Sequence, residues 1–180
     1  MGARRPTVCS VSGFDACGVV TNADVRRLLR QLPTTHRDAK VLRSIQYVDS
    51  VRQETDPRRV RFTTYQVFGE YSVDEPSGEG HATIYRQHPT GNPNTFWLRH
   101  CILHELGHAV YHQELSGSDR AEWAKRHANA VTLYNVQSRA ADEHFCNLYA
   151  AYVLRHEFVR ARFGNFYSFL RERVFEGKEY

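Results

Sequence analysis

The chain has 180 residues, of which 41% are hydrophobic and 24% are charged, a composition typical of one soluble globular domain. No apolar run approaches the roughly 18–20 residues that a membrane-spanning helix needs, so we expect no membrane attachment. The net charge is +4, but the arginines are scattered among nearly as many acidic residues, which disfavours nucleic acid as a partner.

The N-terminus is basic but has no apolar core behind it, so we expect no signal peptide. The sequence leaves the location open between the cytoplasm and export as part of a toxin or effector. We expect a monomer.

The first half of the chain predicts one helix followed by strands. Residues 1–20 have no clear period, so we expect an irregular lead-in before a single domain over residues 21–180. Thr21 and Asp24 have the spacing of a capping box, and the helix that they open ends at Pro33. The β-prone segments that follow are residues 41–49, 60–71 and 81–86.

The second half of the chain predicts helices. The expected helices cover residues 96–112, 120–131, 140–158 and 159–175, with a loop at 132–139. The first of them is apolar around much of its circumference, as a helix packed between a sheet and a second layer should be. The order of helix, strands and helices favours an α+β fold with a small mixed sheet.

A histidine pair in the helix at 96–112 carries the clearest chemical signal. His104 and His108 are four residues apart, so on a helix they lie about 40° from each other on one face. Glu105 follows the first histidine directly, within reach of anything that the two imidazoles bind. Two imidazoles with an adjacent carboxylate are the arrangement that binds Zn²⁺ and leaves a base beside it. We interpret this segment as the active helix of a zinc metallopeptidase.

A catalytic zinc ion needs a third protein ligand, and a second helix is the usual source. His112 lies on the same helix and would have to reach back about 6 Å, which makes it a poor ligand. The other candidates open the helix at 140–158, where Asn147 lies one turn further on and could support a ligand. These candidates are Asp142, Glu143 and His144.

The later helix also carries a resemblance to a known family. Residues 131–134 (Val-Thr-Leu-Tyr) and 143–152 (Glu-His-Phe-Cys-Asn-Leu-Tyr-Ala-Ala-Tyr) resemble the downstream half of gluzincin peptidases related to the anthrax lethal factor catalytic domain. Residues 67–71 and 80–85 are similar to the strands that precede the active helix in that family. The resemblance implies a zincin-like fold with a C-terminal helix that bears the ligand glutamate. It implies Glu143 as the third zinc ligand and Tyr134 as the tyrosine that assists catalysis.

These residues predict a zinc-dependent endopeptidase that acts on a protein or peptide. Glu105 is expected to take a proton from the attacking water, and Tyr134 to donate to the oxyanion. We expect the run from His81 to Tyr85 to be the sheet edge to which an extended substrate adds as a strand. Gly107, without a Cβ atom, is expected to let the active helix approach its neighbour closely.

Other functions stay open at this point. The same fold and metal could serve a catalytically silent, regulatory gluzincin-like domain that binds a partner, although the retained Glu105 argues against it. An aminopeptidase and a nucleic-acid-binding protein with a structural metal are further alternatives. The four cysteines form no CxxC pair. If Glu143 is a ligand, we expect Cys101 and Cys146 to face the same space between two helices, either as a disulfide or as buried free thiols.

Overall fold

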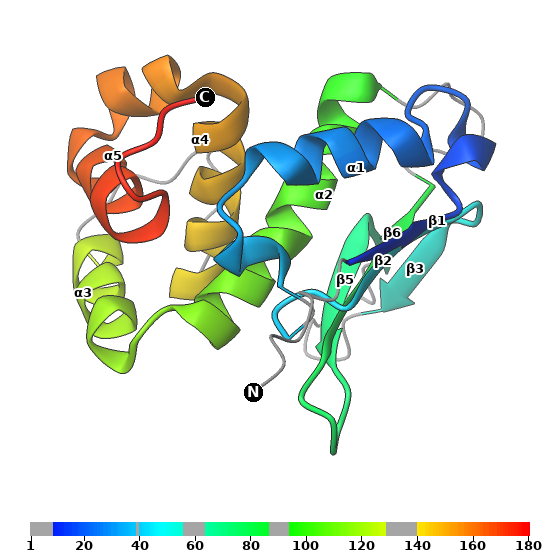
Figure 1. Ribbon diagram of the computed structural model, residues 1–180, viewed down its shortest axis with the longest axis horizontal. Helices are drawn as coiled ribbons and strands as arrows, with labels where there is room; N and C mark the ends of the chain where they lie inside the picture. Colours follow the sequence, from blue (N-terminus) through cyan, green and yellow to red (C-terminus); the bar gives the residue numbers. More distant parts are fainter. Residues whose placement is uncertain (1–8, 39, 56–63, 87–93, 129–139) are drawn as a thin grey trace, which may run out of the picture.

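The computed structural model describes residues 9–38, 40–55, 64–86, 94–128 and 140–180. They form a mixed α+β fold in which a four-stranded sheet and a group of helices lie on either side of the central helix α2 (Figure 1). The strand order of the sheet is β1–β2–β6–β5. Strands β1, β2 and β6 are parallel, and β5 is antiparallel to β6.

The strands are short, and one face of the sheet carries most of its apolar side chains. The sheet contains β1 (Ser10–Ser12), β2 (Ser44–Val48), β5 (Gly69–Val73) and β6 (Gly80–Tyr85). Ile45 and Ala82 are register partners on β2 and β6, and both are buried. Strands β3 (Arg52–Thr55) and β4 (Thr64–Val67) form a separate antiparallel pair, and β4 leads into β5 through Phe68.

The N-terminal segment differs from its prediction. Residues 10–12 form β1, and Phe14–Cys17 form a short 3₁₀ helix, where we expected an irregular lead-in. Val11 and Phe14 are buried in the core. A strand of three residues buries too few side chains to show a period, which is why the sequence pattern missed it. The next helix, α1 (Asn22–Gln31), has the predicted capping box, in which Thr21 and Asp24 bond each other's backbone N–H groups.

The helices follow the expected order with small shifts at their ends. Asn94 caps α2 (Thr95–Ala109), which passes directly into a π-helical segment, Val110–Glu114. Helix α3 spans Gly117–His127, and α4 spans Ala141–Arg162 with a break in its helical backbone at Arg155. Helix α5 (Gly164–Phe169) is followed by a second π-helical segment, Leu170–Val174. The predicted loop at 132–139 lies outside the described residues.

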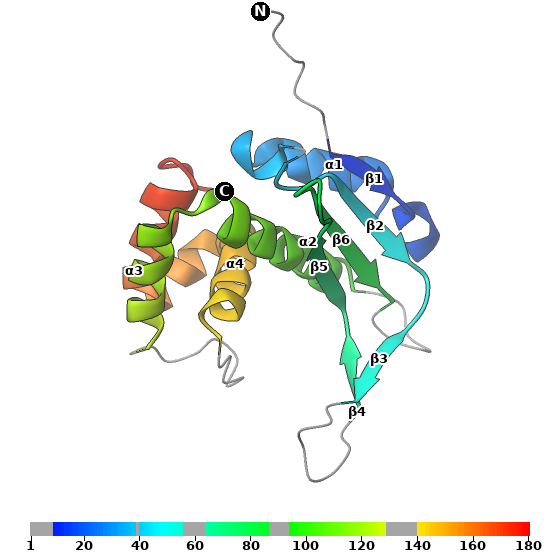
Figure 2. The same cartoon turned by 90° about the horizontal axis from the view of Figure 1, so that it is seen from below.

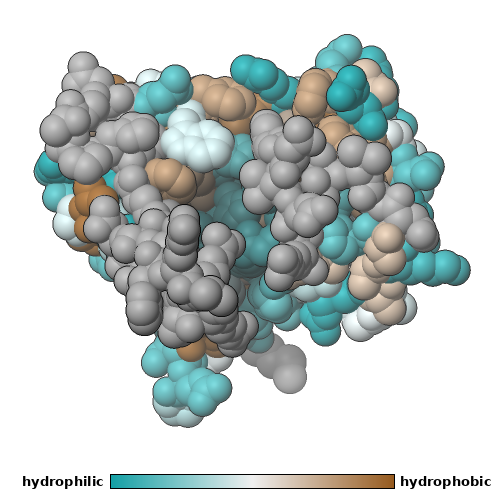
Figure 3. Space-filling model, turned by 180° about the vertical axis from the view of Figure 1, so that it is seen from behind, coloured by the Kyte–Doolittle hydropathy of each residue, from teal (hydrophilic) through white to brown (hydrophobic). Residues whose placement is uncertain are grey.

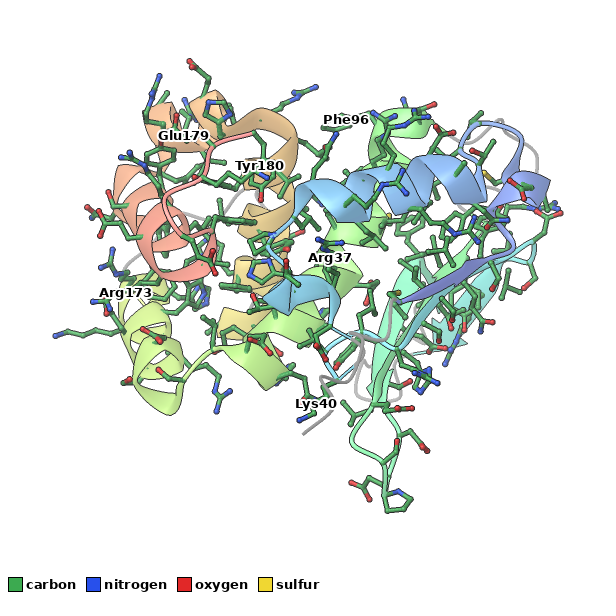
Figure 4. All side chains as sticks on the ribbon, in the orientation of Figure 1. Arg37, Lys40, Phe96, Arg173, Glu179 and Tyr180 are labelled. Atoms are coloured by element: carbon green, nitrogen blue, oxygen red, sulfur yellow. The ribbon has the colours of Figure 1, made fainter. Side chains whose placement is uncertain are left out.

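Helices α2 and α4 pack closely along their length. A Cβ atom placed on Gly107 would lie 2.9 Å from the Cα atom of Cys146, so the close approach expected at this glycine is confirmed. Aromatic rings also pack against α4. The ring of Tyr180, near the C-terminus, contacts the rings of Tyr152 on α4 and Phe175 (Figure 4). The relative position of the two helices is therefore fixed by buried contacts. Among the described helices, none is long and apolar enough to cross a membrane.

Candidate metal centre

Two histidines of α2 meet a glutamate of α4. His104 and His108 lie one turn apart, and Glu143 lies in the first turn of α4. The Nε2 atom of His104 is 3.3 Å from Oε2 of Glu143, and the Nε2 atom of His108 is 3.4 Å from Oε1. The structure therefore brings together the three residues for which the sequence predicted a shared ion.

These distances suit an ion between the groups better than a direct hydrogen bond. Charge-assisted N–H···O bonds measure about 2.7–2.9 Å. Two ligand atoms that each lie about 2.0–2.1 Å from a tetrahedral metal ion are about 3.3–3.4 Å from each other. Imidazole nitrogen and carboxylate oxygen are also the donor types that such ions accept. The three side chains are therefore candidate ligands of one metal ion.

Electrostatics favours a cation at this point. Contacts with His104 and His108 hold the pKa of Glu143 well below its usual range and outweigh the effect of burial. Burial opposes a charge on His108, but Glu143 and Glu105 together outweigh it and raise the pKa of that imidazole. An ionised carboxylate beside two imidazoles attracts a positive charge, and a metal ion supplies that charge without a proton.

Asn147 orients the first histidine. Its Oδ1 atom lies 3.2 Å from Nδ1 of His104, and its amide nitrogen donates to the backbone carbonyl of Glu143. A proton on Nδ1 of His104 leaves the lone pair of Nε2 directed at Glu143. The sequence placed Asn147 behind the glutamate ligand, whereas its side-chain oxygen supports the histidine.

Glu105 lies beside this group and is 5% exposed. Burial, and then the carboxylates of Glu143 and Glu70, raise the pKa of Glu105, although both histidines act in the opposite direction. A raised carboxyl pKa suits a group that must accept a proton and release it again. Glu105 therefore has the surroundings of a general base.

Gly69 on β5 touches this base, although it was not among the residues predicted from the sequence. A Cβ atom at Gly69 would lie 2.5 Å from Oε1 of Glu105, closer than any real side chain allows. The signal was present, because an isolated glycine inside a β-prone run often marks the close approach of another group.

The other two ligand candidates on α4, His144 and Asp142, have different partners. His144 is buried against Trp123 and Phe166, away from the two histidines of α2. Asp142 pairs instead with His112, their Oδ2 and Nε2 atoms 3.7 Å apart. Neither residue replaces Glu143 between His104 and His108.

Cys146 is an alternative third donor. Donor atoms of His104, His108 and Cys146 lie within 4.8 Å of one another. Burial, and then the nearby carboxylates, raise the pKa of this fully buried thiol well above its usual value. Because a thiol binds a metal as the thiolate, the ionised Glu143 is the better ligand. No disulfide bond joins Cys101 to Cys146, so the disulfide alternative is not observed.

A cleft of about 920 Å³ runs between β5 and α2 and reaches Glu143 and Asn147 on α4. From behind, the space-filling view shows a hollow with hydrophilic residues at its base (Figure 3). Figure 2 shows α2 lying between the strand β5 and the helix α4. At the N-terminal end of α2 the wall is aromatic, where the Trp97 ring meets Phe68 edge-on and stacks on His100.

The sheet edge beside the cleft is not the one that the sequence predicted. The run from His81 to Tyr85 belongs to β6, which pairs with β2 on one side and β5 on the other, so that prediction was wrong. Among the described strands, β5 is the outer one on this side. Alternating side chains reveal a strand but not its neighbours, which explains the error.

Tyr134, the other predicted catalytic residue, lies outside the described residues. The proposed oxyanion role therefore stays a prediction from the sequence. No family model, curated protein or solved structure matches the chain, so its function has to be argued from this geometry and from the residues that build it.

Proposed function

We propose that this chain is a zinc-dependent endopeptidase of the gluzincin type, with a zincin-like fold. The observation that carries the proposal is the meeting of His104 and His108 with both carboxylate oxygens of Glu143, at 3.3 and 3.4 Å. The donor set of two imidazoles and one carboxylate, with an open fourth position, is that of a catalytic zinc site. The buried Glu105 beside it supplies the base, which a silent binding domain does not need.

The chemistry divides between the ion and the side chains. A zinc ion held by these three residues would lower the pKa of a water molecule and polarise a peptide carbonyl. Glu105 takes the proton of the attacking water and delivers it to the leaving amine. Asn147 keeps His104 in the tautomer that presents Nε2 to the ion. The family resemblance of the sequence implies that the Tyr134 hydroxyl donates a hydrogen bond to the oxyanion.

The strand β5 is suited to hold the substrate as an added strand. The N–H of Tyr85 donates to the Phe68 carbonyl, and the N–H of Asp74 donates to the Glu79 carbonyl, so the main-chain groups of even-numbered residues face β6. Because these groups alternate along an antiparallel strand, those of Gly69, Tyr71 and Val73 face away from β6.

Residues 67–73 all line the cleft. A segment of this length can pair with an extended peptide on both sides of the scissile bond. An extended peptide that bonds to β5 would pass in front of Glu105, and this length favours an endopeptidase.

The test is digestion of an unbiased peptide library, with and without a chelator. We expect cleavage by the wild type, loss of cleavage with the chelator, and recovery when zinc is added back. Glu105→Gln should bind zinc with wild-type stoichiometry and lose cleavage by about 10²–10⁴-fold, the usual contribution of a general base. Glu157→Gln, on an exposed part of α4, is the matched control and should cleave normally.

The outcomes separate the alternatives. Full cleavage by Glu105→Gln would refute the mechanism. A wild type that binds zinc but cleaves no peptide would favour the regulatory domain. Removal of only the N-terminal residue of each peptide would identify an aminopeptidase.

A further inference from the structure

A second group of metal-binding side chains lies beside the first. Donor atoms of His108, His112 and Asp142 lie within 4.8 Å of one another. His112 extends the histidine row of α2 by one turn, and Asp142 directly precedes Glu143 on α4. The two helices that bring together the first group therefore bring together this one as well.

The π-helical segment keeps His112 on the cleft face. In a regular α-helix each step of four residues rotates a side chain by about 40°, so His112 would turn away from the face that carries His104. The wider winding of Val110–Glu114 reduces this rotation. The rings of His108 and His112 consequently lie nearly parallel, with 7° between their planes and 6.2 Å between their centres.

The spacing between His112 and Asp142 leaves room for an ion. Their Nε2 and Oδ2 atoms are 3.7 Å apart, beyond the range of a good hydrogen bond. That distance is close to the value of about 3.3–3.4 Å expected for two ligands of one tetrahedral zinc ion. The side chain of His112 is 47% exposed, and that of Asp142 is 32% exposed, so an ion and its water ligands can reach them.

We propose that His112 and Asp142, together with a ring nitrogen of His108, form a second zinc site at the outer end of the cleft. Two imidazoles and one carboxylate are a donor set that zinc accepts, with water in the remaining position. The site shares His108 with the metal centre of the proposed function, but it does not require peptidase activity. With both ions bound, His108 would bridge them as an imidazolate, its remaining ring proton released to solvent. Because one histidine serves both sites, zinc at the outer site weakens the hold of the inner site on its own ion. Excess zinc is then an inhibitor of the proposed reaction.

The experiment is a calorimetric titration of the metal-free full chain with zinc. We expect two binding events in the wild type, the second weaker than the first. His112→Gln and Asp142→Asn should each lose the second event and keep the first. His156→Gln, which removes a histidine of α4 in contact with Glu157 and Glu179, is the matched control and should keep both. Thermal unfolding of each metal-free variant checks that the fold is retained.

A wild type that binds one zinc ion even in excess would overturn the inference. A second event that persists in both His112→Gln and Asp142→Asn would also overturn it, because the ion would then bind elsewhere. The failure of the proposed function is a different result. Two binding events without peptide cleavage would leave the outer site in place, and one binding event with cleavage would remove only the outer site.

Discussion

The two walls of the cleft are built in different ways. The helix wall, α2 and α4, carries the candidate metal ligands and is fixed by buried contacts such as that between Gly107 and Cys146. The strand wall, β5, is half-buried to exposed and contributes none of these ligands, yet it touches the general base at Gly69. The ligands and the base both lie on helices, whereas the strand wall limits only the position of the base, so a change at Gly69 should affect proton transfer more than metal binding.

The largest expected effect is at the strand wall. In Gly69→Ala the new methyl group would displace the carboxylate of Glu105, since the two would overlap. We expect peptide cleavage to fall by about 10²–10⁴-fold, as for loss of a general base, with zinc affinity nearly unchanged. Cleavage rates and zinc titrations of the same preparation measure both. Gly164→Ala, where a Cβ atom meets open space, is the control. Equal losses of zinc affinity and cleavage would show that the walls are not independent.

The sequence predicted the helix wall better than the strand wall, for a physical reason. Spacing along one helix fixes which side chains share a face, so the spacing alone was enough to group His104, Glu105 and His108. The pairing of that face with Glu143 was one of several alternatives until the family resemblance selected it. The neighbours of β5 depend on chain topology, which a two-residue period does not contain. The sequence indicates His112 only as a possible third ligand for the first ion, because a π-helical segment after Ala109 has no pattern in the sequence.

Acid should weaken the helix wall. His36 is 3% exposed, its Nδ1 atom lies 2.9 Å from the hydroxyl of Tyr149 on α4, and burial lowers its pKa to about 4. The unfolded chain, with a histidine pKa near 6.5, takes up this proton first. The contribution of His36 to stability is therefore complete above about pH 6.5 and is lost as the pH falls to about 4, a change of about 3 kcal/mol.

Denaturant unfolding of the metal-free protein between pH 7 and pH 4 measures this loss. The variant His36→Gln is less stable at neutral pH because it loses packing against Tyr149 and Phe175. Its stability should nevertheless fall less steeply with acid than that of the wild type, by about 3 kcal/mol over the same interval. Parallel pH profiles for the two proteins would show that His36 does not titrate as proposed.

The smallest expected effect tests substrate binding along the strand wall. Val73 is 41% exposed, and its N–H faces away from β6, so Val73→Pro removes a donor toward the cleft without removing a bond of the sheet. We expect KM for peptides to rise by about 2–10-fold, the usual value of one hydrogen bond, with kcat little changed. Val73→Ala, which keeps the N–H, is the control. An equal rise of KM in both variants would assign the effect to the lost side chain instead.

The contact between Gly69 and Glu105 also bears on inhibition. Inhibitors of metal-dependent enzymes usually carry a group that binds the ion, and such groups bind the ions of unrelated enzymes as well. In this molecule the base lies directly against the strand wall, because no side chain of residue 69 separates β5 from the Glu105 carboxylate. A compound that pairs with β5 and presses a small apolar group into the space above Gly69 would push Glu105 aside. Its selectivity would come from the shape of one strand and one glycine.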